Sequence, residues 1–316
     1  MRAVVTGVAG FIGSHLAERL IKDGHDVVGV DSFTPYYSTS IKESNLTNLN
    51  ASSRFRLIKS DLLAIDLDTL LSDVDLVFHL AAQAGVRASW GHHFKDYTRF
   101  NIEATQELLE ASKDKGLSRF VCASSSSVYG EVEQLPVTEE HPLKPVSPYG
   151  VTKLAAEHLC GIYARNFGVP VVSMRFFTVY GPRQRPDMAI HKFIAAALKG
   201  QPIEVFGDGL QTRDFTFVLD VVEACVLAAT GDATQYIPYN IGGGARITVN
   251  DLVKLLEKIL DTTIQVSNID KQRGDVMHTH SDCGMAKSDF GYSPKHTLEE
   301  GLFEEAAWFR KELATV

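Results

Sequence analysis

The sequence predicts an α/β fold in which a doubly wound parallel sheet is joined to a smaller mixed α/β unit. Two observations support the larger part: short apolar runs alternate with helical patterns as far as Tyr180, and a glycine-rich turn links the first run to the first helix. The smaller part is predicted because this alternation breaks down after Tyr180. With 316 residues, the chain is long enough for one large domain or two interlocked domains.

The elements of the larger part follow from hydrophobic periodicity. A β-branched run at 2–6, a turn at 7–13, an amphipathic helix at 14–23 that ends at Gly24, and a strand at 27–31 form a β-α-β unit. Further strands are expected at 55–60, 76–81, 120–124 and 171–176, and helices at 101–115 and 149–166. Alternating strands and helices indicate a parallel sheet that is covered on both faces.

The part after Tyr180 consists of shorter units. We expect a helix at 191–199, a strand at 203–206, a polar turn at 207–212 and a helix at 249–260. Thr248 with Asp251 matches a helix N-cap for the last of these. Earlier in the chain, the polar segment 36–53 is expected to be a loop with a short helix.

Composition limits the classes of partner. The net charge of −8 and the pI near 5.8 argue against nucleic acid or an anionic membrane surface. No apolar run approaches the roughly 18 residues that a membrane helix needs. The four cysteines lack paired spacing, and the 11 histidines lack the spacing of metal ligands. We therefore expect a cytoplasmic protein that binds no nucleic acid, membrane or metal ion.

The first turn has the glycine spacing of a dinucleotide-binding turn. Gly7 permits the tight turn, Gly10 lets the backbone approach a pyrophosphate, and Gly13 allows the helix to pack on the strand. Phe11 and Ile12 lie between the last two glycines, where helix amides face the phosphates. Because a strand precedes the turn and a helix follows it, these residues predict a dinucleotide site in a Rossmann-type sheet.

Asp31 predicts which dinucleotide is bound. It ends the second strand about 20 residues after the turn, where a carboxylate accepts hydrogen bonds from the adenosine ribose diol. A carboxylate there repels a 2′-phosphate, so NAD is favoured over NADP. Asp61 and Leu62 follow the third strand and can reach the adenine, although a helix cap explains Asp61 equally well.

Tyr149 and Lys153 indicate the chemistry. Their four-residue spacing puts a phenol and an ammonium on one face of a helix, one turn apart. The ammonium favours the phenolate, so the tyrosine can act as a base near neutral pH. Downstream of a dinucleotide turn, this pair predicts nicotinamide-dependent oxidation of a hydroxyl group.

Five motifs occur together in this chain: the glycine turn, His79-Leu80-Ala81-Ala82, Ser-Ser-Ser-Ser-Val-Tyr-Gly at 124–130, Tyr149-x-x-x-Lys153 and Arg213-Asp214-Phe215. With them the chain resembles, over essentially its whole length, the extended short-chain dehydrogenase/reductase superfamily, NAD-dependent epimerase/dehydratase family. The resemblance implies a nucleotide-sugar epimerase, dehydratase or decarboxylase, with Ala81 near the cofactor. We expect an NAD-binding domain at 1–177 plus about 213–240, and a nucleotide-sugar-binding domain at 178–212 and 241–316.

The resemblance also implies roles for the catalytic residues. Ser125 holds the reacting sugar oxygen, Tyr149 is the acid and base, and Lys153 assists it and binds the nicotinamide ribose. Asn101 supports that end of the site. The four consecutive serines at 124–127 are more than turn chemistry requires.

Two positions separate the subfamilies. Similar dehydratases and UDP-glucuronate decarboxylases carry an acid immediately before Val-Tyr-Gly, where this chain has Ser126 and Ser127. Without that proton donor, removal of water or protonation of an enolate is disfavoured, which leaves epimerisation.

The second position follows the strand at 171–176. Residues 177–188 read Phe-Thr-Val-Tyr-Gly-Pro-Arg-Gln-Arg-Pro-Asp-Met, which is similar to UDP-glucuronate 4-epimerases of plants and bacteria. Arg185 offers a planar fork for a carboxylate, and Thr178 with the two serines offers small hydroxyl donors. The alternative is that Arg183 and Arg185 are solvated loop side chains.

For the nucleotide diphosphate, the resemblance points to Arg213 and Arg273, with Asp275 placed to hold a ribose or to orient an arginine. Further candidate nucleotide contacts are Phe206, Gln211 and Lys192, although ordinary packing explains Phe206 nearly as well. Arg87 fits a contact with either sugar or phosphate.

The resemblance therefore implies NAD-dependent epimerisation of UDP-glucuronate to UDP-galacturonate at C4, by hydride abstraction, rotation of a 4-keto sugar and hydride return. A UDP-glucose/UDP-galactose 4-epimerase is the main alternative, and a decarboxylase or another nucleotide-sugar enzyme is a further one. A non-catalytic NAD-binding sensor is disfavoured because sensors commonly lose the Tyr-Lys pair. Similar proteins often dimerise through two helices, which are 101–115 and 149–166 here, so a homodimer is expected.

Overall fold

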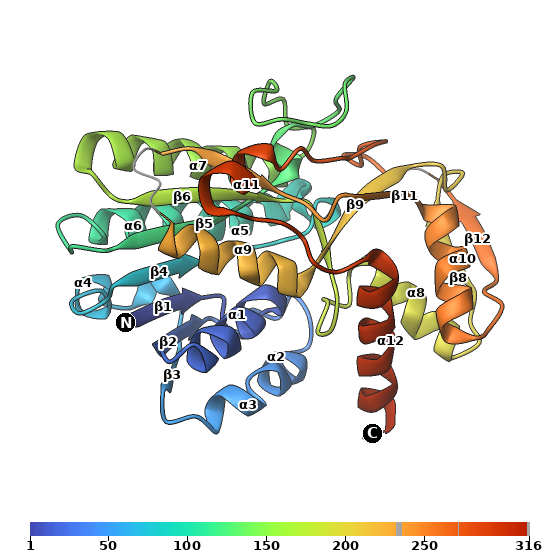
Figure 1. Ribbon diagram of the computed structural model, residues 1–316, viewed down its shortest axis with the longest axis horizontal. Coiled ribbons are helices and arrows are strands. Elements are labelled where there is room, and N and C mark those ends of the chain that lie inside the picture. Colours follow the sequence, from blue (N-terminus) through green and yellow to red (C-terminus); the bar gives the residue numbers. More distant parts are fainter. Residues whose placement is uncertain (232–235, 271, 315–316) are drawn as a thin grey trace.

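The computed structural model describes residues 1–231, 236–270 and 272–314, and its largest feature is a seven-stranded parallel sheet (Figure 1). Its strands in chain order are β1 (Arg2–Thr6), β2 (Asp26–Asp31), β3 (Phe55–Lys59), β4 (Leu76–His79), β5 (Arg119–Ser125), β6 (Val171–Phe176) and β10 (Pro238–Ile241). They lie in the order β10-β6-β5-β4-β1-β2-β3, and every neighbouring pair is parallel. The predicted Rossmann-type doubly wound sheet is therefore confirmed. Within the described ranges, no helix has the length and apolarity needed to cross a membrane.

Side chains that alternate along β1 enter two separate cores. Ala3 and Val5 belong to a core that includes α1 (Phe11–Lys22) and α9 (Val218–Thr230). Val4 belongs to a second core, with α6 (Ala104–Ala111) and α7 (Pro148–Phe167). Because successive strand residues point to opposite faces, this sheet needs apolar residues at nearly every position.

Short helical segments fill the connections. They are α2 (Thr39–Asn45), α3 (Thr47–Asn50), η1 (Leu62–Ala64), α4 (Leu67–Leu70), η2 (Arg87–Ser89), η3 (Gly91–His93), α5 (Phe94–Tyr97), η4 (Thr98–Glu103) and η5 (Ser126–Val128). The helix predicted at 101–115 differs, because η4 is a π-helical turn and α6 starts only after it. Asn101 lies in this turn, and its side chain bonds to other elements, as described below.

The smaller unit is mixed, as predicted. Strands β7 (Thr178–Tyr180), β9 (Thr212–Phe217) and β11 (Ala245–Thr248) form one sheet, in which β9 pairs parallel to β7 and antiparallel to β11. Strands β8 (Ile203–Phe206) and β12 (Val266–Ile269) form a parallel pair. The accompanying helices are α8 (Ala189–Leu198), α10 (Val249–Leu260), α11 (Gly284–Phe290) and α12 (Leu298–Ala314). The segment 213–240 therefore contributes to both sheets, with β9 in the small one and β10 in the large one.

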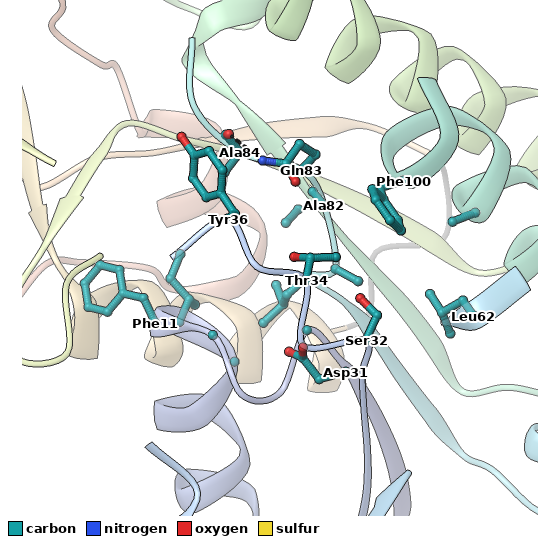
Figure 2. A pocket seen from close by; sticks show the side chains of 18 of the residues that line it. Phe11, Asp31, Ser32, Thr34, Tyr36, Leu62, Ala82, Gln83, Ala84 and Phe100 are labelled. Carbon is teal, nitrogen blue, oxygen red and sulfur yellow. Dashed lines mark hydrogen bonds between the residues drawn. The ribbon is translucent and has the colours of Figure 1, made fainter. Parts of the chain in front are cut away.

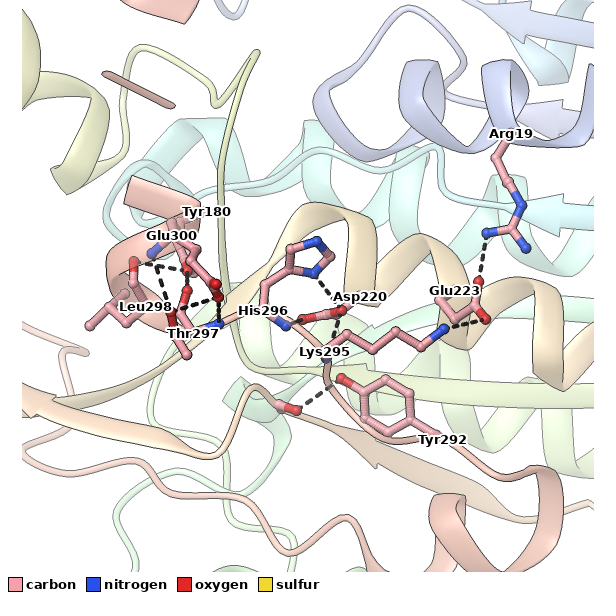
Figure 3. A network of polar contacts seen from close by, with 11 residues as sticks. Arg19, Tyr180, Asp220, Glu223, Tyr292, Lys295, His296, Thr297, Leu298 and Glu300 are labelled. Atoms are coloured by element: carbon pink, nitrogen blue, oxygen red, sulfur yellow. Dashed lines mark hydrogen bonds and ion pairs between the residues drawn. The ribbon is translucent and has the colours of Figure 1, made fainter. Parts of the chain in front are cut away.

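A polar network connects the two units ahead of α12 (Figure 3). Arg19 of α1 pairs with Glu223 of α9 at 2.5 Å, and Lys295 pairs with the same carboxylate at 3.3 Å. Asp220 accepts the backbone N–H groups of Lys295 and His296. The start of the C-terminal helix is thus tied to two helices of the large sheet.

Candidate active site

The glycine turn between β1 and α1 is a close crossing of backbone segments. Gly7 has a φ of 70°, and a Cβ there would lie 2.9 Å from the Cα atom of Ala81. A Cβ on Gly13 would lie 2.2 Å from the Gly7 carbonyl oxygen. Helix α1 begins at Phe11 without a side-chain cap, so its first backbone N–H groups can bind an anion.

One cavity joins this turn to the carboxyl ends of the neighbouring strands. All the residues predicted to bind the cofactor line it: Gly7, Gly10, Phe11, Ile12, Gly13, Asp31, Asp61, Leu62, Ala81, Tyr149 and Lys153. Figure 2 shows Asp31 and Ser32 near one end of this cavity and Tyr36 with Ala84 near the other. The lining therefore runs from the position predicted for the adenosine ribose to the Tyr-Lys pair.

Backbone donors fix the Asp31 carboxylate. Its Oδ2 atom accepts the Ala9 N–H at 3.1 Å, and its Oδ1 atom accepts the Phe33 N–H at 2.8 Å. Lys42 Nζ lies 3.9 Å from Oδ1, and this buried lysine also lines the cavity. Burial lowers the pKa of Lys42, and the Asp31 charge opposes that shift. Sequence reasoning missed Lys42 because no motif in the polar segment 36–53 distinguishes it.

Asp61 is a helix cap that also borders the cavity. Its Oδ1 atom accepts the Leu63 N–H at 2.9 Å at the start of η1, and its Oδ2 atom pairs with Arg99 at 2.8 Å. The cap interpretation of Asp61 is thus observed. A contact with the adenine stays a prediction.

The Tyr-Lys pair lies at the start of α7. Ser147 caps this helix through its side chain, which places Tyr149 in the first turn and Lys153 one turn later. Lys153 is buried, and its Nζ atom donates to the Ala123 carbonyl oxygen at 2.9 Å. The Tyr97 ring packs edge-on against Tyr149 with 6.2 Å between centroids. Both predicted catalytic side chains are therefore held by neighbours at the wall of the cavity.

Asn101 braces the segment after β4 against α7. Its Oδ1 atom accepts the Gln83 N–H at 2.7 Å, and its Nδ2 atom donates to the Gln83 carbonyl oxygen at 3.0 Å. The same Nδ2 atom donates to Thr152 Oγ1 at 2.9 Å. Since Gln83 lines the cavity and Thr152 precedes Lys153, Asn101 links the cavity wall to α7, and its support of the catalytic site stays a prediction.

The four serines after β5 have different neighbours. Ser124 lines the cavity, and its hydroxyl donates to Glu157, which pairs with Arg175 at 2.8 Å in the core below. Ser125 accepts the Ser127 N–H at 3.2 Å, which starts the η5 turn. Ser125, Ser126 and Ser127 are partly buried, but unlike Ser124 they are not among the residues that line the cavity, so their roles toward a substrate stay predictions. The sequence did not reveal the Glu157–Arg175 pair, because no local motif marks the contact between helix α7 and the strand β6 that follows it.

Arg185 lines the cavity together with Tyr149, and the solvated-loop interpretation is wrong. Its side chain is 22% exposed, and its Nε and Nη2 atoms donate to Asp187 at 2.9 and 3.0 Å. Arg183 is 16% exposed and pairs with Glu18 of α1 at 2.8 Å. Both arginines therefore have internal carboxylate partners.

A second group of side chains surrounds Arg87. Its guanidinium carbon lies 3.8 Å from the centroid of the Phe206 ring, and its Nη2 atom pairs with Asp275 at 2.7 Å. Burial lowers the pKa of the nearby Arg213, and the Asp275 charge opposes this shift. Gln211 donates to the Phe206 carbonyl oxygen at 2.9 Å. The structure thus brings together four predicted nucleotide contacts and adds Arg87 to them.

For three of the predicted residues, no contact among the described residues joins them to the cavity or to the group around Arg87. Lys192 of α8 and Arg273 are exposed, and Thr178 begins β7 in a partly buried position. Their roles toward a substrate stay predictions.

Known proteins are similar to this chain over its whole length. It is 47% identical over 309 residues to the uncharacterized UDP-glucose epimerase YtcB of Bacillus subtilis (strain 168), with 98% of both chains covered. It is 36% identical over 331 residues to a probable UDP-glucuronate 4-epimerase of Rhizobium meliloti (strain 1021), with 98% of this chain and 97% of the relative covered. The UDP-glucuronic acid 4-epimerase of Bacillus cereus, solved in complex with UDP-glucuronic acid and NAD, is 43% identical. It superposes with a TM-score of 0.96 over 99% of this chain and 100% of that one.

The comparisons confirm the expected family and the expected cofactor. Residues 3–242 match a family that is described as NAD dependent, and the Bacillus cereus relative was solved with NAD. The chain belongs to the NAD dependent epimerase/dehydratase family.

Proposed function

We propose that the chain interconverts UDP-glucuronate and UDP-galacturonate at C4 with NAD as its cofactor. The coarser class, an NAD-dependent nucleotide-sugar 4-epimerase, follows from its family and relatives. The observation that supports the uronate substrate is the position of Arg185, which lines the same cavity as Tyr149 and Lys153. A guanidinium there offers a partner for a carboxylate close to the reacting carbon. The relatives from Bacillus cereus and Rhizobium meliloti carry this activity in their names.

The cavity lining fits NAD. The backbone amides at the start of α1 would hold the pyrophosphate, because they have no side-chain cap. The glycines at 7 and 13 carry no Cβ atom, which leaves room for the close backbone contacts of the turn. Asp31 would accept the adenosine ribose hydroxyls, and Lys153 would bind the nicotinamide ribose. When bound, NAD supplies a hydride acceptor and donor.

Tyr149 would move the proton. Its phenolate takes the proton of the sugar 4-hydroxyl as C4 is oxidised to a ketone, and the phenol returns this proton when C4 is reduced. Lys153 lies one turn away on the same helix and lines the same cavity. Ser125 would hold the reacting oxygen. Rotation of the keto sugar about its link to the anchored UDP exposes its other face, so the configuration at C4 is inverted.

Arg185 would also protect the intermediate. A 4-keto uronate is a β-keto acid, which can lose carbon dioxide. A guanidinium stabilises the carboxylate more than the neutral carbon dioxide that leaves. Ser126, Ser127 and Thr178 lie outside the cavity lining, so they would add hydroxyl donors only where the bound sugar reaches them. The serine at position 127 supplies no proton for an enolate, which disfavours decarboxylation and dehydration.

The group around Arg87 would hold the UDP moiety. Phe206 offers an aromatic face for the base, Asp275 an acceptor for ribose hydroxyls, and Arg87 and Arg213 two charges for the diphosphate. Because Arg87 now contacts both Phe206 and Asp275, nucleotide binding would exchange these contacts for contacts with the ligand.

A UDP-glucose 4-epimerase is the second candidate. Asp187 already compensates the charge of Arg185, and a compensated guanidinium is compatible with a neutral sugar. The name of the Bacillus subtilis relative points the same way.

Product analysis separates the candidates. The purified holoenzyme is incubated with UDP-glucuronate and, separately, with UDP-glucose, and the products are identified by NMR and mass spectrometry. We expect UDP-galacturonate as the main product, with slower conversion of UDP-glucose. UDP-galactose alone would establish the second candidate, and a UDP-pentose would establish a decarboxylase.

A further inference from the structure

Arg185 binds a carboxylate that belongs to its own chain. The Nε and Nη2 atoms of Arg185 form a two-pronged contact with the Asp187 oxygens at 2.9 and 3.0 Å. Tyr36, which also lines the cavity, donates to Asp187 Oδ2 at 3.3 Å. Figure 2 shows the Tyr36 ring near Ala84, at the end of the cavity away from Asp31. Asp187 is therefore held from two sides.

The charges in this group cancel. Burial favours the neutral form of Asp187, yet the Arg185 charge and its hydrogen bonds hold the pKa of Asp187 below its ordinary value. Burial also opposes the charge of Arg185, but Asp187 raises the pKa of Arg185 above its ordinary value. Burial and the Asp187 charge raise the pKa of Tyr36 to about 12, so this phenol keeps its proton. At neutral pH the group comprises one cation, one anion and one neutral donor.

Arg185 still has donors to offer. A guanidinium carries five N–H donors, and Asp187 accepts two of them, one from Nε and one from Nη2. The remaining three donors are two on Nη1 and one on Nη2. The edge of the guanidinium formed by Nη1 and Nη2 can therefore bind a second carboxylate in a bidentate manner. A ligand carboxylate thus need not displace Asp187, although it meets a cation whose charge is already compensated.

We propose that Asp187 sets how strongly this cavity prefers a uronate to a neutral sugar, by compensating the charge of Arg185. This inference rests on the proposed function, in which Arg185 faces the C5 substituent of the sugar. With Asp187 present, Arg185 keeps a charged partner even when the bound sugar is neutral and carries a hydroxymethyl group at C5. Without it, a neutral sugar would leave a mostly buried cation unpaired, which is costly, and a uronate would restore the pair. Removing the charge of Asp187 should therefore sharpen the preference for the uronate.

The test compares Asp187→Asn with Asp187→Glu, which keeps the charge. The measured quantity is the ratio of kcat/KM for UDP-glucuronate to kcat/KM for UDP-glucose, with NAD content as a check. Asp187→Asn should raise this ratio by about tenfold or more, which corresponds to about 1.4 kcal/mol of discrimination. Most of the change should be a lower kcat/KM for UDP-glucose. Asp187→Glu should remain near the wild-type ratio.

Several outcomes would overturn the inference. An unchanged or lower ratio in folded, NAD-loaded Asp187→Asn would show that the Asp187 charge does not control selection. Equal losses on both sugars would assign Asp187 to the shape of the loop. Asp187→Ser is a second uncharged replacement. If both uncharged variants fail to fold while Asp187→Glu folds, Asp187 serves stability, and the inference is wrong.

Failure of the proposed function gives a different result. In that case the wild-type enzyme converts UDP-glucose and leaves UDP-glucuronate unchanged. The preference is then measured as the ratio of the dissociation constant for UDP-glucose to that for UDP-glucuronate, each determined by calorimetry with the NAD-loaded enzyme. Asp187→Asn should still shift that ratio toward the uronate by about tenfold, and no shift would overturn the inference in this case also.

Discussion

The residues proposed to bind NAD and those proposed to bind the nucleotide sugar are held in place in different ways. Around the glycine turn, the groups that would contact NAD are mainly backbone amides and fixed carboxylates, such as the start of α1 and Asp31. The groups proposed to contact the nucleotide sugar are long charged side chains with internal partners, namely Arg185 with Asp187 and Arg87 with Asp275. In the first region, backbone hydrogen bonds and a close crossing of backbone segments hold these groups in place. In the second region, a ligand meets charged groups that already have partners inside the protein.

This difference suggests where each function is determined. A backbone site accepts one shape of ligand, so it suits a cofactor that is the same in every turnover. A site of paired side chains can be tuned by one substitution, so it suits a choice between related sugars. Changes in the first region should therefore affect all substrates equally, and changes in the second region should not.

Tyr149→Phe should have the largest effect. It removes the proton acceptor, so turnover should fall at least about 100-fold on every nucleotide sugar, while bound NAD remains largely intact. Stopped assays with UDP-glucuronate and UDP-glucose, together with the NAD content of the purified variant, provide the measurement. Near-normal turnover would move the base to Ser125 or a water molecule.

Arg185→Ala should affect the two sugars unequally. Loss of one partner of a charge pair in an enclosed site costs about 2–5 kcal/mol, so kcat/KM for UDP-glucuronate should fall steeply. The residual activity on UDP-glucose should fall less, and some 4-keto pentose should appear if the carboxylate seat prevents decarboxylation. Equal losses would place Arg185 with the loop or the diphosphate instead.

Gly7→Ala should disrupt the backbone site, and Gly24→Ala is its matched control. Both glycines have positive φ, so each alanine costs about 1–3 kcal/mol of backbone strain. Only at Gly7 does the added Cβ also meet another chain segment, at Ala81, whereas nothing lies within 4 Å at Gly24. We expect loss of bound NAD and of activity on both sugars for Gly7→Ala alone. Similar NAD content in the two variants would contradict the close crossing.

Asp31→Asn should weaken NAD binding by about 10- to 100-fold, since a hydrogen bond to a charged group contributes about 1.5–3 kcal/mol. The discrimination against NADP should fall as well, because the carboxylate no longer repels a 2′-phosphate and Lys42 is close by. Fluorescence titration of both cofactors into stripped protein measures this. Asp26→Asn, at the exposed start of the same strand, is the control.

Glu305→Gln should have the smallest effect, on stability and not on selection. Glu305 is buried in α12 and accepts the Gly181 N–H at 2.9 Å, and burial raises its pKa well above the ordinary value. As pH rises above the ordinary carboxyl pKa, the unfolded chain loses this proton and the folded chain keeps it, so stability falls. Glutamine removes that fall, so the Tm of the variant should exceed that of the wild type increasingly between pH 5 and 8. The exposed neighbour Glu304→Gln should show no such trend.

Local patterns made the cofactor region predictable. The glycine spacing, Asp31 at the end of a strand and the Tyr-Lys spacing are each contained in a few consecutive residues, and all their members line one cavity. The partners of charged groups were not predictable, because Lys42, Glu157 and Arg175 meet their neighbours only through the tertiary fold. The π-helical turn around Asn101 was missed for a similar reason, since the helical periodicity continues through it.

Helix α1 is shared by the two regions. Its first turn lines the cavity proposed for NAD, while His15 Nε2 donates to the Pro182 carbonyl oxygen at 2.9 Å and Glu18 pairs with Arg183. The loop that carries Arg185 is thus anchored on the helix that receives the cofactor. Binding energies at the two places should therefore be thermodynamically linked: the cofactor should tighten nucleotide-sugar binding, and the sugar should tighten cofactor binding by the same factor.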